Sequence, residues 1–598
     1  MASPVTTRTV RPLDALHLDI AGPPPLTGLV GHHLRLLGAS TGDAAEPGAP
    51  TSSAPPAGSL TLTGGGFAPV RAGTGWSAPG TGITDEATAQ AATGVMSVHG
   101  RRDGHPRGTA ADCVATATAV LTVQGLLAAL LAQARGGTTS RVATRADHAG
   151  LLMVSQYLAA AGADEGEAAE LAPGGPPFTS ADGTLFELET LDPGAWAAFW
   201  RALEAGTDAV RRGWRPFQFR YATACAPLPG ALHDTARGHS FEAIRRAAAV
   251  AGADVCRVRT LKERAAEHDG ADPWTLALLR PAAPAPPGAA PGPDRPLAGL
   301  TVLEAGRRIQ APLTAHLLGL LGADVVRVEP PGGDPLRGMP PACSGTSARW
   351  LALNRGKRAV EIDIKDPAGR DRLRDLAAGA DVFLHNWAPG KAAELGLDAT
   401  DFARVNPALV YTYTGGWAGR IPGAPMGTDF MVQARTAVGE AVRPEGEPPA
   451  PSLMTLLDVL GGLLGAEAVL AGLLLRERTG HGVRVDSSLL GAADTLTGPA
   501  LRRAARGENP RHPAGYRHPL RTADGWIAPS DACAAAARAY DLTALTTGDA
   551  LAMLRTHGLA ATPVTTDLAG LLHDPRLGGS ISRDAHGAPA VPDPWSFA

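Results

Sequence analysis

Cysteine, aromatic side chains and a surplus of either charge are all scarce in this chain of 598 residues. Its five cysteines are scattered and form no CxxC pair, so we expect no disulfide framework, no metal site and a reducing, cytoplasmic setting. The N-terminal segment has no apolar core of the kind that signal peptides carry. A net charge of −4 provides no field that would draw the chain to nucleic acid. The one feature that would favour nucleic-acid binding is the short arginine-containing loop 502–511.

One apolar run is long enough to raise the question of a membrane. Residues 113–132 contain no charged side chain, and about 20 apolar residues span a bilayer. The related run 453–475 carries Asp458 and Glu467, each of which would cost about 2.5–3.5 kcal/mol or more at the membrane centre. We therefore expect two buried helices and no membrane contact, with a transmembrane helix as the alternative.

One pattern occurs twice in the chain. Residues 454–486 align without a gap with residues 343 positions earlier, and the turn TADG at 522–525 matches SADG at 180–183. The carboxylate Asp458 then falls on Ala115, so only the second copy has this acid. A repeat of this length predicts two related domains, and the difference places the chemistry in the second.

The repeat and one Pro-rich stretch together suggest the domain organisation. Residues 281–296 are rich in Pro and Ala and lack apolar periodicity, which is typical of a linker. We expect a degenerate domain at 1–280, this linker, and an intact domain at 297–598. Within the intact domain we expect a large part at 297–510, a small α/β part at about 515–570 and a C-terminal return at 571–598.

Strand and helix patterns alternate in the second copy, which predicts an α/β fold with a doubly wound, Rossmann-like parallel sheet. The strands are expected at 300–304, 324–329, 358–364, 381–385 and 408–414, with helices at 312–321 and 367–378. In the first copy, residues 25–39 match this pattern at an offset of 287 instead of 343. The first copy is therefore expected to be truncated by the difference, 343 − 287 = 56 residues.

Asp458 is the leading candidate for a catalytic group. It stands at the start of a helix expected at 459–478, where unpaired backbone N–H groups and the helix dipole favour a carboxylate. Gly461 and Gly462 follow and would allow another molecule to approach the backbone. One interpretation is a simple N-cap, and the other is a nucleophile that forms a covalent acyl intermediate.

Several collinear motifs of the second copy resemble one enzyme family. They are LLGADVVRVEPPGGD at 320–334, LNRGKRAVEIDIKDP at 353–367, DVFLHNWAPG at 381–390, TGGWAGRIPGAP at 414–425 and TDFMVQA at 428–434. In this order they are similar to the family III CoA-transferases, the group of formyl-CoA and carnitine CoA-transferases and methylacyl-CoA racemases. The resemblance covers roughly 297–598.

This resemblance implies a function and a set of site residues. Asp458 would attack an acyl-CoA thioester and carry CoA to a carboxylic acid, a transfer of a sulfur-containing group, with Gln310 and Asp429 beside the substrate. The substrate would be coenzyme A in its acyl form, without a metal. The residues implied for CoA binding are Arg355, Lys357, Arg358, Lys365, Asn386, Trp387 and Lys391. Glu394 stands where the family usually has an arginine, and Thr428 where racemases have a histidine, which disfavours racemase chemistry.

Members of the family form homodimers whose chains interlock, and each partner completes the site of the other. The resemblance thus implies a fused, interlocked pseudo-dimer with one composite site, whereas neutral decay of a redundant copy is the alternative. Further self-association stays open. Two other functions are also open: acyl-CoA lyase or dehydratase chemistry, and non-catalytic binding of acyl-CoA.

Overall fold

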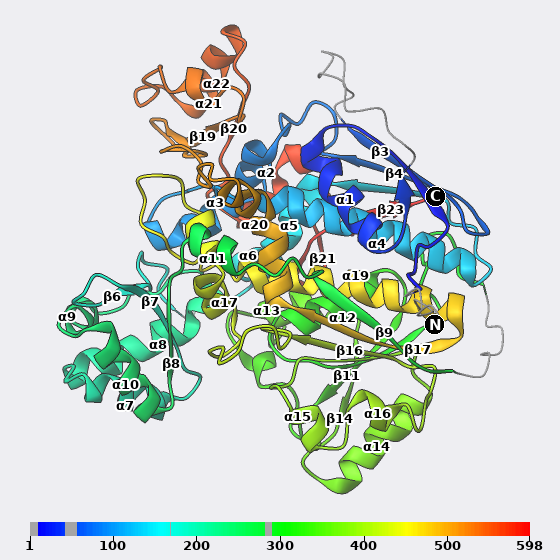
Figure 1. Ribbon diagram of the computed structural model, residues 1–598. Coiled ribbons are helices and arrows are strands. Elements are labelled where there is room, and N and C mark those ends of the chain that lie inside the picture. Colours follow the sequence, from blue (N-terminus) through cyan, green and yellow to red (C-terminus); the bar gives the residue numbers. More distant parts are fainter. Residues whose placement is uncertain (1–9, 42–56, 168, 282–289) are drawn as a thin grey trace, which may run out of the picture.

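The computed structural model describes residues 10–41, 57–167, 169–281 and 290–598 (Figure 1). It is an α/β structure built on two large sheets, one for each copy of the repeat. Half of the expected linker, residues 282–289, lies outside the described residues.

The sheet of the second copy is the doubly wound sheet that its sequence pattern predicts. Its strand order is β14-β11-β10-β15-β16-β17-β9, and all neighbours are parallel except β17 and β9. Buried apolar strands alternate with helices such as α12 (Gln310–Leu320) and α14 (Pro367–Ala378). The strands are β9 (Trp274–Pro281), β10 (Thr301–Ala305), β11 (Asp324–Glu329), β14 (Arg358–Glu361), β15 (Val382–His385), β16 (Val410–Gly415) and β17 (His481–Ser488).

The first copy is truncated, as predicted, and a hairpin closes the gap. Its sheet has the order β2-β1-β3-β4-β5-β23, with β1 (Leu16–Ala21), β2 (Ser40–Thr41), and the helix α1 (Pro24–Leu36) between them. The antiparallel pair β3 (Gly58–Gly64) and β4 (Phe67–Gly75) stands where the second copy has parallel β15 and β16. An antiparallel pair needs only a short turn, whereas parallel strands need a crossover, and this accounts for the shorter chain.

Each copy ends with a strand that joins the sheet of the other copy. Strand β9 closes the first copy and pairs with β17, whereas β23 (Trp595–Phe597) closes the second copy and pairs with β5 (Arg141–Arg145). Trp274 lies opposite Ser487, and Trp595 lies opposite Thr144. Figure 1 shows the C-terminus beside the blue strands of the first copy. The exchange is reciprocal, so the two copies form an interlocked pseudo-dimer.

Two long helices lie at the centre of the molecule, α4 (Cys113–Ala134) and α19 (Leu456–Thr479). Both are long and apolar enough to span a membrane, but 94% of each apolar window is buried inside the protein. Glu467 lies within α19 and accepts a hydrogen bond from His33 at 3.0 Å, and burial raises the pKa of its carboxyl group. The helices therefore meet each other and the sheets, as core helices do.

The two small domains are also exchanged between the copies. The first small domain contains β6 (Phe178–Thr179), β7 (Leu185–Glu189) and β8 (Asp254–Arg257), and it packs on α17 (Asp429–Arg435) of the second copy. The second contains β18 (Leu520–Arg521), β19 (Trp526–Pro529) and β20 (Ala561–Pro563), and it packs on α2 (Glu86–Ala92) of the first. Figure 1 shows these domains at the left and at the upper left. Helices of the small domains are α7 (Pro193–Ala202), α8 (Thr207–Thr223), α9 (Gly230–Arg237), α10 (Phe241–Ala251), α21 (Ala534–Ala537) and α22 (Thr547–Thr556).

Candidate active site

Asp458 is accessible in a segment that is otherwise buried. Every other residue from 450 to 475 is buried, and Asp458 alone is partly exposed. Burial of its surroundings raises the pKa of the Asp458 carboxyl well above its usual range, and the charge of Asp429 adds to this effect, whereas Arg308 opposes it. Asp458 is thus partly open to solvent, although its carboxyl group is largely surrounded by protein.

The local backbone differs from the expected one. Helix α19 begins at Leu456, so Asp458 lies in the first turn and is not the N-cap. The N-cap is Thr455, whose φ of 53° is a left-handed conformation that β-branched residues rarely adopt. The hydroxyl of Tyr157, from the first copy, lies 3.4 Å from the Thr455 hydroxyl. Strain of this kind persists only where the surroundings impose it, and it is typical of functional sites.

Asp429 holds the backbone of the candidate nucleophile. Its buried carboxylate accepts a hydrogen bond from the backbone N–H of Asp458 at 2.6 Å and another from the side-chain amide of Gln433. The amide oxygen of Gln433 in turn accepts the backbone N–H of Ser452 at 2.8 Å. Burial raises the pKa of Asp429. The predicted residue Asp429 therefore lies beside Asp458 and positions it through the main chain.

Residues of the first copy contribute to the surroundings of Asp458. The carboxylate of Glu189 accepts hydrogen bonds from Thr428, at 2.8 Å, and from Tyr221. Tyr221 stacks on Phe430 of α17, with ring centroids 4.5 Å apart. The exposed guanidinium of Arg308, in the loop before α12, lies 5.4 Å from the centre of the Tyr221 ring. The negative charge of Glu189 and the positive charge of Arg308 both act on the pKa of Asp458.

Gln310 has an amide group without a partner. Its side-chain nitrogen is buried and makes no hydrogen bond with the described residues. A Cβ built on Gly461 would lie 2.9 Å from this nitrogen, so Gln310 lies over α19 one turn beyond Asp458. Buried donors without a partner are rare, and a substrate oxygen would satisfy this one.

The residues predicted to bind CoA are divided between buried and exposed positions. Lys357 is buried and donates to Glu304 (2.8 Å), to the Pro312 carbonyl (2.8 Å) and to Asn354 (2.9 Å). All three N–H bonds of this ammonium are thus used within the protein, and its pKa is lowered to about 8 by burial. Arg355 is half-buried and donates to the Val591 carbonyl at 3.3 Å.

The other five predicted residues lie nearer the surface. Lys365 is exposed and makes no ion pair with a described residue, whereas Arg358 pairs with Asp324. Asn386 exchanges two hydrogen bonds of 2.9 Å with the backbone of Arg307, and so ties the end of β15 to the loop before α12. Trp387 is partly buried against Phe383, and Lys391 pairs with Glu394 at 2.7 Å.

Comparison with known proteins agrees with this geometry. The family model described as CoA-transferase family III matches residues 75–275 and again residues 297–576. The chain belongs to CoA-transferase family III. The two matches also bear out the tandem duplication.

Curated relatives of this family III protein match one part of it. Succinyl-CoA:glutarate CoA-transferase of Mus musculus is 36% identical over 199 residues, which are 33% of this chain and 46% of the relative. The beta subunit of succinyl-CoA–L-malate CoA-transferase of Chloroflexus aurantiacus is 37% identical, over 32% of this chain and 49% of the relative. The chain thus spans about half the length of these relatives.

A solved structure of a CAIB/BAIF family protein from Brucella suis also resembles the chain. It is 27% identical and has a TM-score of 0.45. The match covers 50% of this chain and 91% of that protein.

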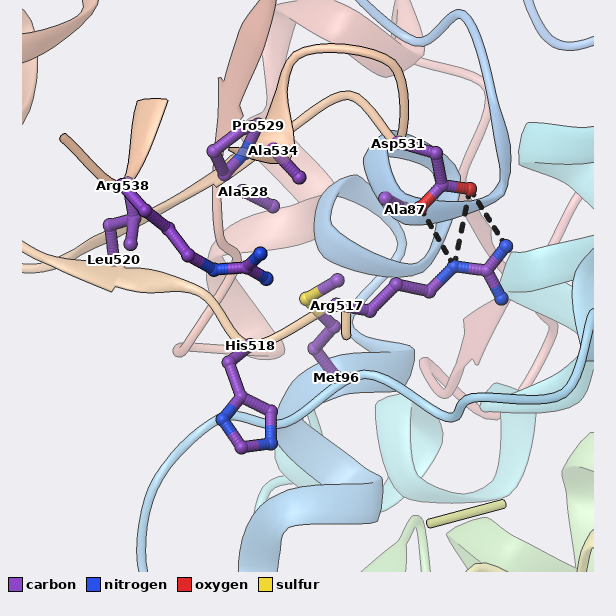
Figure 2. Close-up of a pocket in the computed structure, with 10 residues that line it drawn as sticks. All are labelled: Ala87, Met96, Arg517, His518, Leu520, Ala528, Pro529, Asp531, Ala534 and Arg538. Atoms are coloured by element: carbon purple, nitrogen blue, oxygen red, sulfur yellow. Dashed lines mark hydrogen bonds and ion pairs between the residues drawn. The ribbon is translucent and has the colours of Figure 1, made fainter. Parts of the chain in front are cut away.

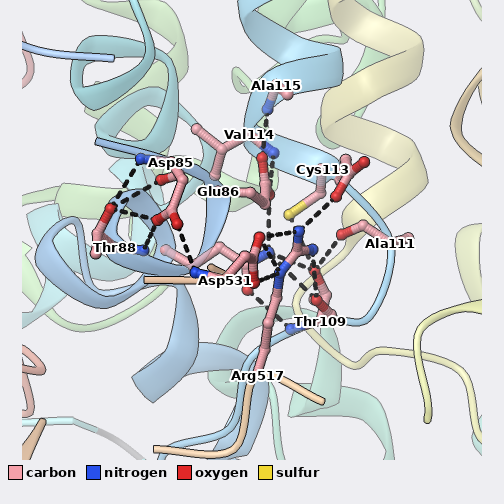
Figure 3. Close-up of polar contacts among 12 residues, drawn as sticks. Asp85, Glu86, Thr88, Thr109, Ala111, Cys113, Val114, Ala115, Arg517 and Asp531 are labelled. Carbon is pink, nitrogen blue, oxygen red and sulfur yellow. Dashed lines mark hydrogen bonds and ion pairs between the residues drawn. The ribbon is translucent and has the colours of Figure 1, made fainter. Parts of the chain in front are cut away.

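The first copy of this family III protein retains the same backbone clamp without the nucleophile (Figure 3). The carboxylate of Glu86 accepts the backbone N–H groups of Val114, at 2.9 Å, and Ala115, at 2.8 Å. Gln90 donates to Glu86 at 2.8 Å, as Gln433 donates to Asp429 in the second copy. The degenerate site thus has a methyl group where the other has Asp458.

An arginine plugs one side of the degenerate site. Arg517 is buried and donates to Asp112 and to Asp531, each at 2.7 Å (Figures 2 and 3). The cavity beside it has a volume of only about 10 Å³. At the offset of 342 that aligns the two TADG-like turns, Arg517 corresponds to Gly175 and Asp531 corresponds to Glu189. At this position the site of Asp458 has Gly175 and therefore no corresponding arginine.

Sequence reasoning assigned no role to Glu189, Tyr221 or Arg308. The residues of the first copy are distant in sequence from Asp458, and no motif marks them. The repeat offers one signal for Glu189, because the offset of 342 aligns it with another acid, Asp531. An acid at the same position in both copies indicates a shared role.

Proposed function

We propose that this protein transfers CoA from an acyl-CoA thioester to a carboxylic acid through a covalent intermediate on Asp458. The observation that carries this proposal is that Asp458, at the start of a buried helix, is partly exposed. The membership of a CoA-transferase family supports it. Because the named relatives use succinyl-CoA with glutarate or malate, dicarboxylates are the substrates to test first.

The reaction takes four steps. A carboxylate oxygen of Asp458 attacks the thioester carbonyl, the C–S bond breaks, and an aspartyl anhydride and CoA thiolate result. The thiolate attacks the aspartyl carbonyl and releases the first carboxylate, which leaves an aspartyl-CoA thioester. The acceptor carboxylate attacks this thioester and forms a second anhydride with release of the thiolate. The thiolate then takes the new acyl group and restores the Asp458 carboxylate.

The neighbouring residues have distinct parts in this scheme. The unpaired amide of Gln310 can donate to the oxyanion that forms at each attack, as donors of an oxyanion hole do. The positive charge of Arg308 favours the ionised nucleophile and a carboxylate substrate. Lys365 and Arg355, near the ends of the sheet strands, are the cations that we propose for the phosphate groups of CoA. The first copy completes the site through Glu189 and Tyr221.

Trapping of the intermediate tests this proposal. The protein is incubated with succinyl-CoA, treated with hydroxylamine or borohydride, digested and mapped by mass spectrometry. We expect a modified Asp458, and an acceptor labelled with ¹⁸O in its carboxylate should pass label to this residue. Modification of another residue, or none during turnover, contradicts the mechanism.

Two further measurements separate the alternatives. A lyase or dehydratase would convert the acyl group without a carboxylate acceptor and would transfer no ¹⁸O. A binding protein would show no turnover. The variant Asp458→Ala should lose turnover and keep its affinity for CoA, and Asp371→Ala, an exposed acid on α14, serves as the control.

A further inference from the structure

A second, much larger cavity lies between the two copies. Its volume is about 850 Å³, within the range of about 300–1,000 Å³ that small-molecule sites occupy. It lies between α1 and α20 (Leu489–Ala505), and Ala115 at the start of α4 forms part of its wall. It is thus separate from the site of Asp458 and adjoins the position where the first copy has lost its nucleophile.

The repeat shows which part of the second copy corresponds to this cavity. In the second copy, α13 (Ala348–Asn354) packs on both α12 and α6 (Ser155–Ala161). The counterparts of these two helices are α1, at the offset of 287, and α20, at the offset of 343. Among the described residues of the first copy, no helix follows β2 before the next strand of the sheet, as α13 follows β11 in the second copy. The cavity thus lies between the counterparts of the two helices on which α13 packs.

The lining of the cavity contains both apolar and cationic side chains. Leu29, Leu36, Leu496 and Leu501 provide the apolar part. Arg502 and Arg503 stand at the end of α20, and Arg502 is exposed and makes no ion pair with a described residue.

Most acids of the lining are already neutralised by arginine. Asp494 pairs with Arg264 at 2.6 Å and with Arg420 at 3.1 Å, and Asp112 pairs with Arg517. Only Asp272 among the lining acids makes no ion pair with a described residue. A ligand here therefore meets a surplus of positive charge beside apolar walls.

We propose that this cavity is a binding site for a carboxylic acid with a short apolar chain. The carboxylate pairs with Arg502 and Arg503, and the chain lies among the leucines. Because Ala115 replaces the nucleophile, the ligand is bound without a covalent bond. The first copy also lacks the CoA-binding motifs of the second, so the free acid is a better fit than its CoA thioester.

Calorimetric titration of the full chain with octanoate tests this site. We expect saturable binding of one octanoate, and binding of octanol, which has no charge, weaker by about tenfold or more. Gly28→Trp should abolish octanoate binding, because Gly28 lines the cavity and its Cβ position is open. Gly28→Ala is the matched control and should bind as the unaltered protein does.

The charge argument has its own controls. The double variant Arg502→Gln with Arg503→Gln should lose about fivefold or more in affinity, whereas Arg506→Gln, on a residue paired with Glu508, should lose none. Asp458→Ala should keep octanoate binding. No saturable binding, equal binding of octanol, or normal binding by Gly28→Trp overturns the proposal. Loss of binding in Asp458→Ala would place octanoate in the other site. None of these titrations depends on turnover. Their outcome is therefore independent of the test of the proposed function.

Discussion

The carboxylate of Asp429 accepts the backbone N–H of Asp458 at a distance of 2.6 Å. Glu86 holds the N–H of Ala115 in the same way, at 2.8 Å. The clamp is thus a property of the fold, and the side chain that it presents decides whether a site can react. This pair of matched sites supplies internal controls for several predictions.

Replacement of Asp458 should stabilise the protein, and more so at high pH. The folded pKa of Asp458 is raised, so above about pH 4 the unfolded chain has lost a proton that the folded chain still holds. Stability therefore falls as pH rises from the unfolded pKa to the folded pKa. Asp458→Asn removes this loss of stability. We expect the free energy of unfolding to rise by about 1 kcal/mol or more at pH 8 and to change little at pH 4. Denaturant unfolding at both pH values measures it, and an equal gain at both contradicts the prediction.

The charge of Asp429 should set the acid limb of the pH–rate profile. Burial raises the pKa of Asp458, and the charge of Asp429 raises it further. Only the ionised nucleophile attacks, so activity should fall as pH is lowered through this pKa. Asp429→Asn keeps an oxygen for the backbone N–H and removes the charge. We expect the limb of kcat to move to lower pH by about one unit, with a reduced plateau. An unshifted limb would show that the charge has no such role.

Glu189 should matter for activity although it belongs to the degenerate copy. Glu189→Gln weakens the bonds with Thr428 and Tyr221, and we expect kcat to fall by about tenfold or more. Asp531→Asn alters the corresponding residue of the plugged site and should leave kcat unchanged. Equal effects of the two variants on kcat would argue against a composite site.

Lys365 should contribute to the binding of acyl-CoA. It is exposed and unpaired with any described acid, so Lys365→Gln should raise KM for acyl-CoA about two- to fivefold with little change in kcat. Initial rates at low and high salt measure this, and the effect should shrink at high salt. Arg404→Gln, on an exposed arginine paired with Asp401, is the control.

The exchanged strands should stabilise the copy that they join. Trp595 donates to the Leu121 carbonyl of α4 at 2.7 Å and is almost fully buried. Trp595→Ala should destabilise the protein by about 3–5 kcal/mol, as loss of a buried tryptophan does. Trp274→Ala, on the matching strand of the other sheet, should cost a similar amount. Unfolding of both variants by denaturant checks this, and a loss below about 1 kcal/mol would contradict it.

The sequence by itself determined the repeat, the family, the doubly wound sheet of the second copy and the identity of Asp458 as the acid without a counterpart. These features depend on local patterns and on motifs that are continuous in the chain. It also predicted the truncation of the first copy, since the change of offset from 287 to 343 is visible in the residues alone.

Only the tertiary structure decided which side chains surround Asp458. Glu189 lies 269 positions before it and reaches the site because the small domains are exchanged between the copies. The tertiary structure also decided that the Lys357 side chain is buried and not free to bind a phosphate. Its ammonium group donates hydrogen bonds to Glu304 and to two further acceptors. The plug formed by Arg517 and the cavity between α1 and α20 follow from packing over long distances in sequence. No local pattern records such packing.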